Sequence, residues 1–192
     1  MTIGRPLLFF ASGIVLATTF SGCGPNVPAA PNVSGAPAAT IQAQAADLPA
    51  RVKALEDLIP DQAHIMADVA DHFTNLWFAG SAENWLLADF YLNETRSHLR
   101  WAVRRIPVRK DNLGREVKLE AILQAFENGP LEQLKRAVAA RNQADFEKSY
   151  KETLSGCYAC HKASDKPFLR PRIPAGPATP IINFDPRADW PH

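Results

Sequence analysis

The spacing of apolar residues predicts helices from about residue 47 onward. Apolar side chains recur at the period of an amphipathic helix over 60–78, 85–105, 117–126, 131–141 and 145–163. No segment has the convincing alternation of apolar and polar residues that is typical of a strand. Four of these segments as principal helices, joined by short turns and with 117–126 as a shorter segment, predict an all-α fold, and an antiparallel four-helix bundle in particular.

Local signals place the ends of these helices. Gly80 is expected to end the first helix, and Ser81 is expected to cap the second. Asn142 is expected to cap the last helix. The segment 167–192 is rich in proline, which prevents a regular helix, so we expect an irregular extension that covers part of the domain surface.

Residues 1–22 have the pattern of a bacterial export signal. Arg5 is followed by an apolar run that is shorter than the roughly 20 residues of a membrane span. The tetrapeptide Phe-Ser-Gly-Cys that ends at Cys23 resembles a lipobox, with phenylalanine in place of the usual leucine. In a lipobox the cysteine becomes the lipidated first residue of the mature protein. We expect lipidation at Cys23; the alternative is an ordinary secretory signal with an unrelated cysteine.

The segment that follows the signal has no hydrophobic period. Residues 23–47 are mostly small residues and proline, which predicts a flexible tether. The expected organisation is therefore this tether, a helical domain over 48–166 and the irregular extension. The chain has 21 basic and 20 acidic side chains, and cleavage after residue 22 removes one basic residue. This balance gives no reason to expect a nucleic acid as partner.

The strongest chemical signal is the sequence Cys-Tyr-Ala-Cys-His at 157–161. On a helix, Cys157, Cys160 and His161 leave one face within an arc of about 100°. Two thiols can add to the vinyl groups of one haem, and the adjacent imidazole can bind its iron. A zinc site would need a second ligand pair, a thioredoxin-type dithiol would need a βαβ context, and a disulfide would leave His161 unexplained. We expect one covalently bound haem c.

The ligand on the other side of the iron decides what such a haem does. A sulfur ligand favours electron transfer, whereas an open position admits small gases. Met66 is the only Met after the signal and falls on the apolar stripe of the first helix, so it is the favoured distal ligand. His72 lies at the edge of that stripe and is the alternative. His64 is expected to face away from the apolar stripe, and His98 is a further candidate. The third alternative is that no protein side chain binds the iron at this position.

The order of these features resembles that of the class II c-type cytochromes. These are four-helix bundles with the haem on the last helix, and the resemblance covers about residues 60–163. It implies that Cys157, Cys160 and His161 hold the haem and that Met66 is a candidate ligand. The lipobox, the tether and the proline-rich extension depart from that family.

A closer similarity is to small exported bacterial proteins with a Cys-x-x-Cys-His end and an upstream signature. The signature includes Met66, His72 and the Leu-Trp pair at 76–77. This similarity implies no particular activity.

Together these features predict a lipid-anchored monohaem cytochrome that carries single electrons on the periplasmic side of a bacterial membrane. Gly24 follows the lipidated cysteine where an aspartate would favour the inner membrane, so the outer membrane is expected. The alternative is a five-coordinate haem protein, similar to the cytochromes c′, that binds or senses a diatomic gas. A peroxidase is not expected, because His72 is the only nearby acid–base residue. The redox partner is not indicated, and a homodimer is expected only by analogy with class II relatives.

Overall fold

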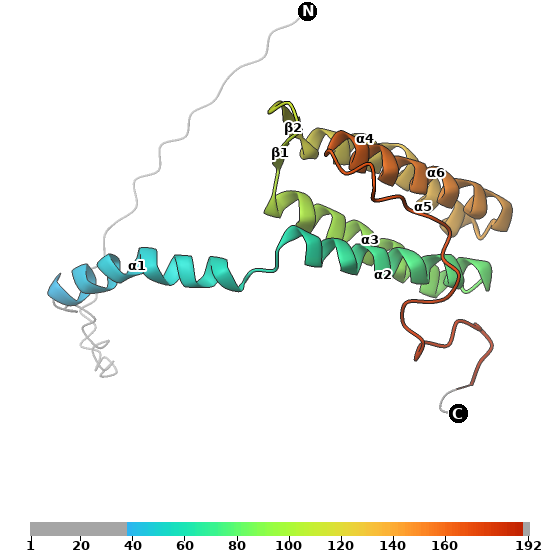
Figure 1. Ribbon diagram of the computed structural model, residues 1–192. Coiled ribbons are helices and arrows are strands. Elements are labelled where there is room, and N and C mark those ends of the chain that lie inside the picture. Colours follow the sequence, from blue (N-terminus) through green and yellow to red (C-terminus); the bar gives the residue numbers. More distant parts are fainter. Residues whose placement is uncertain (1–37, 190–192) are drawn as a thin grey trace, which may run out of the picture. The chain divides into compact units, whose positions relative to one another are not determined.

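The computed structural model describes residues 38–189 of the chain (Figure 1). Its contacts divide the chain into two units, residues 1–49 and 50–192. Helix α1 (Ala38–Leu58) includes the boundary, and its side chains over 45–58 are exposed. Residues 38–47 are thus helical, although the sequence predicts a tether there. The alanines and glutamines of this stretch are strong helix formers without an apolar period, so periodicity alone misses the helix.

The second unit is mostly helical, which confirms the all-α prediction. In chain order its elements are α2 (Gln62–Ser81), α3 (Trp85–Arg105), β1 (Val108–Lys110), β2 (Glu116–Lys118), α4 (Leu119–Asn128), α5 (Pro130–Ala140) and α6 (Gln143–Ala163). Among the described residues, no helix is both long and apolar enough to cross a membrane.

The short hairpin of β1 and β2 is absent from the sequence-based expectation. The strands pair in antiparallel fashion, and Asp111 accepts hydrogen bonds from the backbone amides of Leu113 and Arg115 in the turn between them. Gly114 adopts a φ of 77° there, which glycine tolerates best. Each strand has three residues, too few for an alternating pattern to stand out. Residue 117, expected to begin a helix, belongs to β2.

The ends of α2 and α3 differ from the expected positions. Ser81 is the last residue of α2, and Asn84 caps α3 instead, since its side chain accepts the backbone N–H of Leu87. Three residues, 82–84, separate the two helices, and Glu83 among them has a φ of 57°. The predicted cap of α6 is confirmed, because the Asn142 side chain accepts the backbone N–H of Asp145.

Gly80 does not end α2, contrary to the sequence-based expectation. It is buried in the last turn of that helix, where the Phe146 ring of α6 lies against it. A β-carbon at this position would overlap the ring. The glycine is therefore explained by close packing between helices rather than by helix termination.

The core joins the α2–α3 pair to α5 and α6. In Figure 1, α5 and α6 lie above the α2–α3 pair. Phe73 of α2 stacks on Tyr150 of α6 with ring centroids 4.3 Å apart, and the Tyr150 hydroxyl donates a hydrogen bond to the Phe73 carbonyl at 2.9 Å. Buried leucines complete this core: Leu76, Leu92, Leu131 and Leu134.

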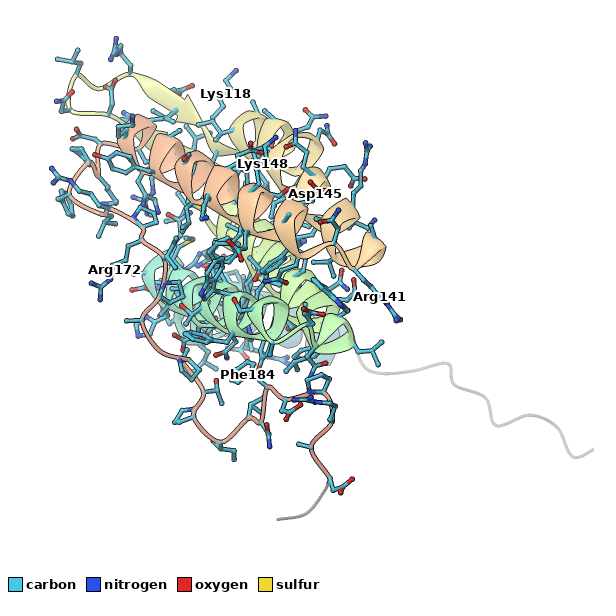
Figure 2. All side chains as sticks on the ribbon, turned by 90° about the vertical axis from the view of Figure 1, so that its right-hand side faces the viewer. Lys118, Arg141, Asp145, Lys148, Arg172 and Phe184 are labelled. Atoms are coloured by element: carbon cyan, nitrogen blue, oxygen red, sulfur yellow. The ribbon has the colours of Figure 1, made fainter. Side chains whose placement is uncertain are left out.

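The chain beyond α6 is irregular and passes alongside α2 (Figure 2). Buried Asn75 holds it: its side-chain oxygen accepts the amides of Ala178 and Thr179, and its NH₂ group donates to the Thr179 hydroxyl. Further along, the Phe184 ring packs against Tyr91 of α3. This segment therefore returns over the α2–α3 pair after leaving the end of α6.

Candidate functional site

The Cys-Tyr-Ala-Cys-His sequence occupies the last turns of α6. Cys157 and Cys160 are free, partly buried thiols, and the helix ends two residues after His161. The Ser164 amide donates a hydrogen bond to the Cys160 carbonyl at 2.9 Å and so closes the last turn. Because residues three and four apart are neighbours on a helix surface, the two thiols lie on one side of α6.

The surroundings of the two thiols differ from those of a redox dithiol. Burial raises the pKa of Cys157 to about 12, and the neighbouring Cys160 adds to this shift. Burial also raises the pKa of Cys160, against the effect of a hydrogen bond with Ser164. Catalytic dithiols have a lowered thiol pKa and lie at a helix N-terminus. These thiols are protonated at neutral pH and lie at a helix C-terminus, so they fit attachment points better than a redox pair.

His161 is held in a defined orientation by the irregular segment that follows α6. Its Nδ1–H donates a hydrogen bond to the backbone carbonyl of Leu169 at 2.9 Å. The Lys166 amide donates to the His161 carbonyl at 2.8 Å, and the Tyr158 hydroxyl donates to the Pro167 carbonyl at 3.2 Å. With Nδ1 protonated and occupied, Nε2 carries the lone pair for a metal. This is the usual state of a metal-binding histidine.

Gly156 precedes the first thiol and allows close packing behind it. A β-carbon on Gly156 would lie 2.5 Å from the ring of Phe126 in α4. The aromatic ring therefore covers the backbone of α6 directly next to Cys157. The sequence offers no signal for this contact, since Phe126 and Gly156 are far apart along the chain.

Met66 lies on the face of α2 that is directed to α6. Phe73 and Trp77 both contact Tyr150 of α6, and Met66 precedes them by seven and eleven residues, within about 20° on the helix. Cys157 follows Tyr150 by seven residues and shares its face in the same way.

The two helices also run in opposite directions, because Gly80 meets Phe146 whereas Phe73 meets Tyr150. Two further turns along each helix from the Phe73–Tyr150 contact therefore place Met66 and Cys157 at the same level. Met66 is partly buried.

His72 is turned toward α3. Its ring lies 4.8 Å from that of His98 and 6.1 Å from that of Tyr91, measured between centroids. Burial lowers the pKa of His72, with the nearby His98 as the next cause. His64 is exposed beside Asp61, which agrees with its expected outward position. The structure thus groups His72 with α3 side chains.

Two features of these candidate sites leave little or no signal in the sequence. The Leu169 carbonyl that orients His161 is a backbone group and leaves no residue-type signal. The neighbourhood of His72 and His98 has a weak signal: each follows a carboxylate by four residues, Asp68 and Glu94. Cys23, the expected lipidation site, lies outside the described residues.

Comparisons of the chain with models of protein families, with curated proteins and with solved structures each find no match.

Proposed function

We propose that this chain is a monohaem c-type cytochrome that carries single electrons at the periplasmic face of a bacterial membrane. Cys157 and Cys160 would form thioethers to one haem, and His161 would bind its iron. A four-helix bundle of α2, α3, α5 and α6 would surround the group. Lipidated Cys23 would anchor the protein, with the outer membrane as the favoured location.

The observation that carries this proposal is the hydrogen bond from His161 Nδ1 to Leu169. It leaves Nε2 as the free nitrogen of an imidazole next to two free thiols on the same end of α6. A disulfide or a redox dithiol would use the thiols but not this oriented imidazole. The raised pKa of Cys157 also argues against a reactive thiolate. Haem attachment uses all three residues.

Met66 is the proposed distal ligand. It shares the α2 face of Phe73 and Trp77, whose rings contact Tyr150, and it reaches the level of Cys157. His72, the alternative, is turned toward α3 and contacts His98 instead. A thioether ligand suits an electron carrier, since it raises the reduction potential and occupies the position that a gas would need.

The bound group would supply a one-electron couple, and the chain's own residues would set its surroundings. Leu169 fixes the imidazole through its carbonyl, so little rearrangement of this ligand is needed when the charge changes. The aromatic side chains of Phe73, Trp77 and Tyr150 form an apolar wall that limits water.

Visible spectroscopy of the purified ferric and ferrous protein tests this proposal. A low-spin spectrum that carbon monoxide does not change supports the electron carrier. The ferric protein should also show the weak long-wavelength absorption band that is typical of a methionine sulfur bound to haem iron. A high-spin spectrum that shifts on addition of carbon monoxide would overturn it in favour of the five-coordinate gas-binding protein. Incorporation of labelled palmitate, lost in Cys23→Ser, tests the anchor separately.

A further inference from the structure

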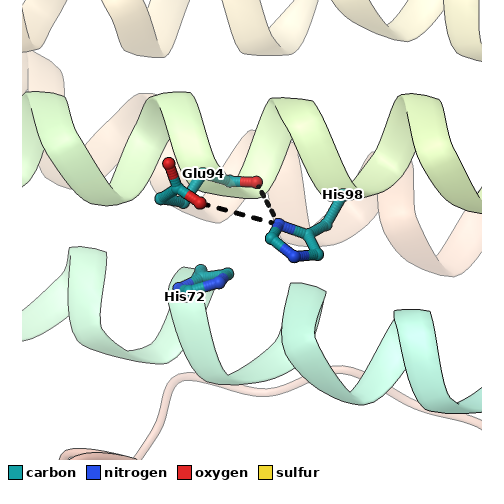
Figure 3. A group of neighbouring side chains, drawn as sticks. All are labelled: His72, Glu94 and His98. Atoms are coloured by element: carbon teal, nitrogen blue, oxygen red, sulfur yellow. Dashed lines mark hydrogen bonds and ion pairs between the residues drawn. The ribbon is translucent and has the colours of Figure 1, made fainter.

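A second group of metal-binding side chains lies between α2 and α3. The ligand atoms of His72, Glu94 and His98 all lie within 4.8 Å of one another (Figure 3). None of these residues belongs to the Cys-x-x-Cys-His sequence. They come from two helices that pack along their length, so their positions depend on the core of the domain rather than on a loop.

The two histidines differ in whether their Nδ1 atoms have a hydrogen-bond partner. His98 Nδ1–H donates a hydrogen bond to the Glu94 backbone carbonyl at 2.9 Å, which leaves Nε2 with the lone pair. His72 Nδ1 is buried and has no hydrogen-bond partner among the described residues. A buried, unpartnered ring nitrogen is costly unless a ligand or water satisfies it. One imidazole is therefore oriented for binding, and the other lacks a partner that binding would supply.

A fourth side chain extends the group. The Asp68 carboxylate lies 3.9 Å from His98 Nε2, and the Glu94 carboxylate lies 3.9 Å from His98 Nδ1. Asp68 precedes His72 by one turn on α2, and Glu94 precedes His98 by one turn on α3. Each helix thus offers a carboxylate and an imidazole on one face. Asp68 is 54% exposed whereas His98 is 19% exposed, so solvent and ions reach the group from the Asp68 side.

We propose that His72, Glu94 and His98, with Asp68 as the outer ligand, form a binding site for a divalent transition-metal ion such as Zn²⁺. Two neutral imidazoles and two carboxylates match the nitrogen and oxygen ligands that Zn²⁺ and its first-row neighbours accept. Two negative charges balance the charge of the ion. Because the site uses no residue of the proposed haem centre, ion binding here does not depend on whether a haem is attached.

The test is a calorimetric titration of the full-length purified protein, freed of metal with a chelator, with Zn²⁺. One ion per chain is expected, and His72→Gln and His98→Gln should each weaken binding about tenfold or more. The matched control is His64→Gln, since His64 is an exposed histidine on the same helix with its own carboxylate neighbour, Asp61. No saturable binding, or equal weakening in His64→Gln, would overturn the proposal.

Two further measurements guard against misfolding and misassignment. Glu94→Gln keeps the shape of the side chain, so it should retain the circular dichroism of the parent while it weakens Zn²⁺ binding. X-ray absorption at the zinc edge should show only nitrogen and oxygen ligands, without the absorption shell of a thiolate sulfur. A sulfur shell would place the ion on cysteine and contradict the site, as would a change in the haem spectrum of His72→Gln.

Discussion

Among the described residues, a backbone carbonyl orients the imidazole at two places, and the neighbouring side chains decide what each imidazole can bind. At the end of α6, His161 donates through Nδ1 to the carbonyl of Leu169, in the irregular segment that follows. Between α2 and α3, His98 donates through Nδ1 to the carbonyl of Glu94, in its own helix. Both rings keep Nε2 free by the same device.

The two places differ in the side chains that lie next to the imidazole ring. His161 has two thiols on its own helix, which suit covalent attachment of a haem. His98 has a second imidazole and two carboxylates from neighbouring turns, which suit a small divalent ion. The first set is local in sequence and the second is assembled by helix packing. This difference predicts that the two sites respond independently to mutation.

Removal of the thiols should have the largest effect. Cys157→Ser combined with Cys160→Ser removes both attachment points, so covalent haem should be lost completely. The measurement is haem staining of the protein after denaturing electrophoresis. Cys23→Ser is the matched control, since it removes the remaining cysteine and should keep the stain. A stained double variant would contradict the proposed attachment.

Exchange of the candidate distal ligands should separate the two sites most clearly. Met66→Leu keeps an apolar side chain of similar volume but removes the sulfur, so the low-spin spectrum should become high-spin. His72→Gln should leave the spectrum unchanged, because His72 faces α3. The ferric visible spectrum of both variants is the measurement. If His72→Gln changed the spectrum and Met66→Leu did not, His72 would be the iron ligand and would not belong to a separate site.

Loosening the irregular segment should have an intermediate effect, which concerns the stability of the fold. Asn75→Ala removes three hydrogen bonds to Ala178 and Thr179 and should lower the free energy of unfolding by about 1–3 kcal/mol. Chemical denaturation measures this loss. Asn93→Ala is the control, because Asn93 bonds only its neighbour Asp89 on the surface of α3. Equal destabilisation by the two variants would show that Asn75 does not hold the segment.

The smallest effect concerns pH and belongs to the α2–α3 group alone. Burial lowers the pKa of His72, so below its ordinary value of about 6.5 the unfolded chain binds this proton more readily than the folded chain. Stability should be fully present above that value and should fall as the pH drops through the lower, folded pKa. The charge on His98 acts in the same direction, and the carboxylates of Glu94, Asp68 and Asp71 oppose it.

Thermal melting between pH 8 and pH 5 in the presence of a chelator measures this dependence. His72→Gln should flatten the decline toward low pH, whereas His64→Gln should keep it. A decline that persists unchanged in His72→Gln would assign the acid sensitivity to other groups.

The sequence predicts what is local and misses what is made by packing. The end of α3 at Arg105 and the Asn142 cap follow from residue pattern alone, because capping and periodicity are properties of neighbouring residues. The role of Gly80 does not follow from the pattern, since it depends on contact with Phe146 in another helix. The hairpin is missed because its strands are too short to show a period.

The same distinction holds for the sites. Spacing alone groups Cys157, Cys160 and His161 as one candidate site, and they lie on the last turns of α6. The Leu169 carbonyl is invisible in sequence because every residue has one. His72 and His98 lie far apart along the chain, so only the antiparallel packing of α2 on α3 brings them together.

Mass spectrometry of one peptide tests the central claim most directly. Cleavage after Lys151 and Lys162 releases residues 152–162, which contain Cys157, Cys160 and His161. This peptide, from protein produced with its export signal in a bacterium that matures c-type cytochromes, should carry the added mass of one haem. The same peptide with two free thiols or an internal disulfide, and no haem-bearing form, would rule out covalent haem attachment.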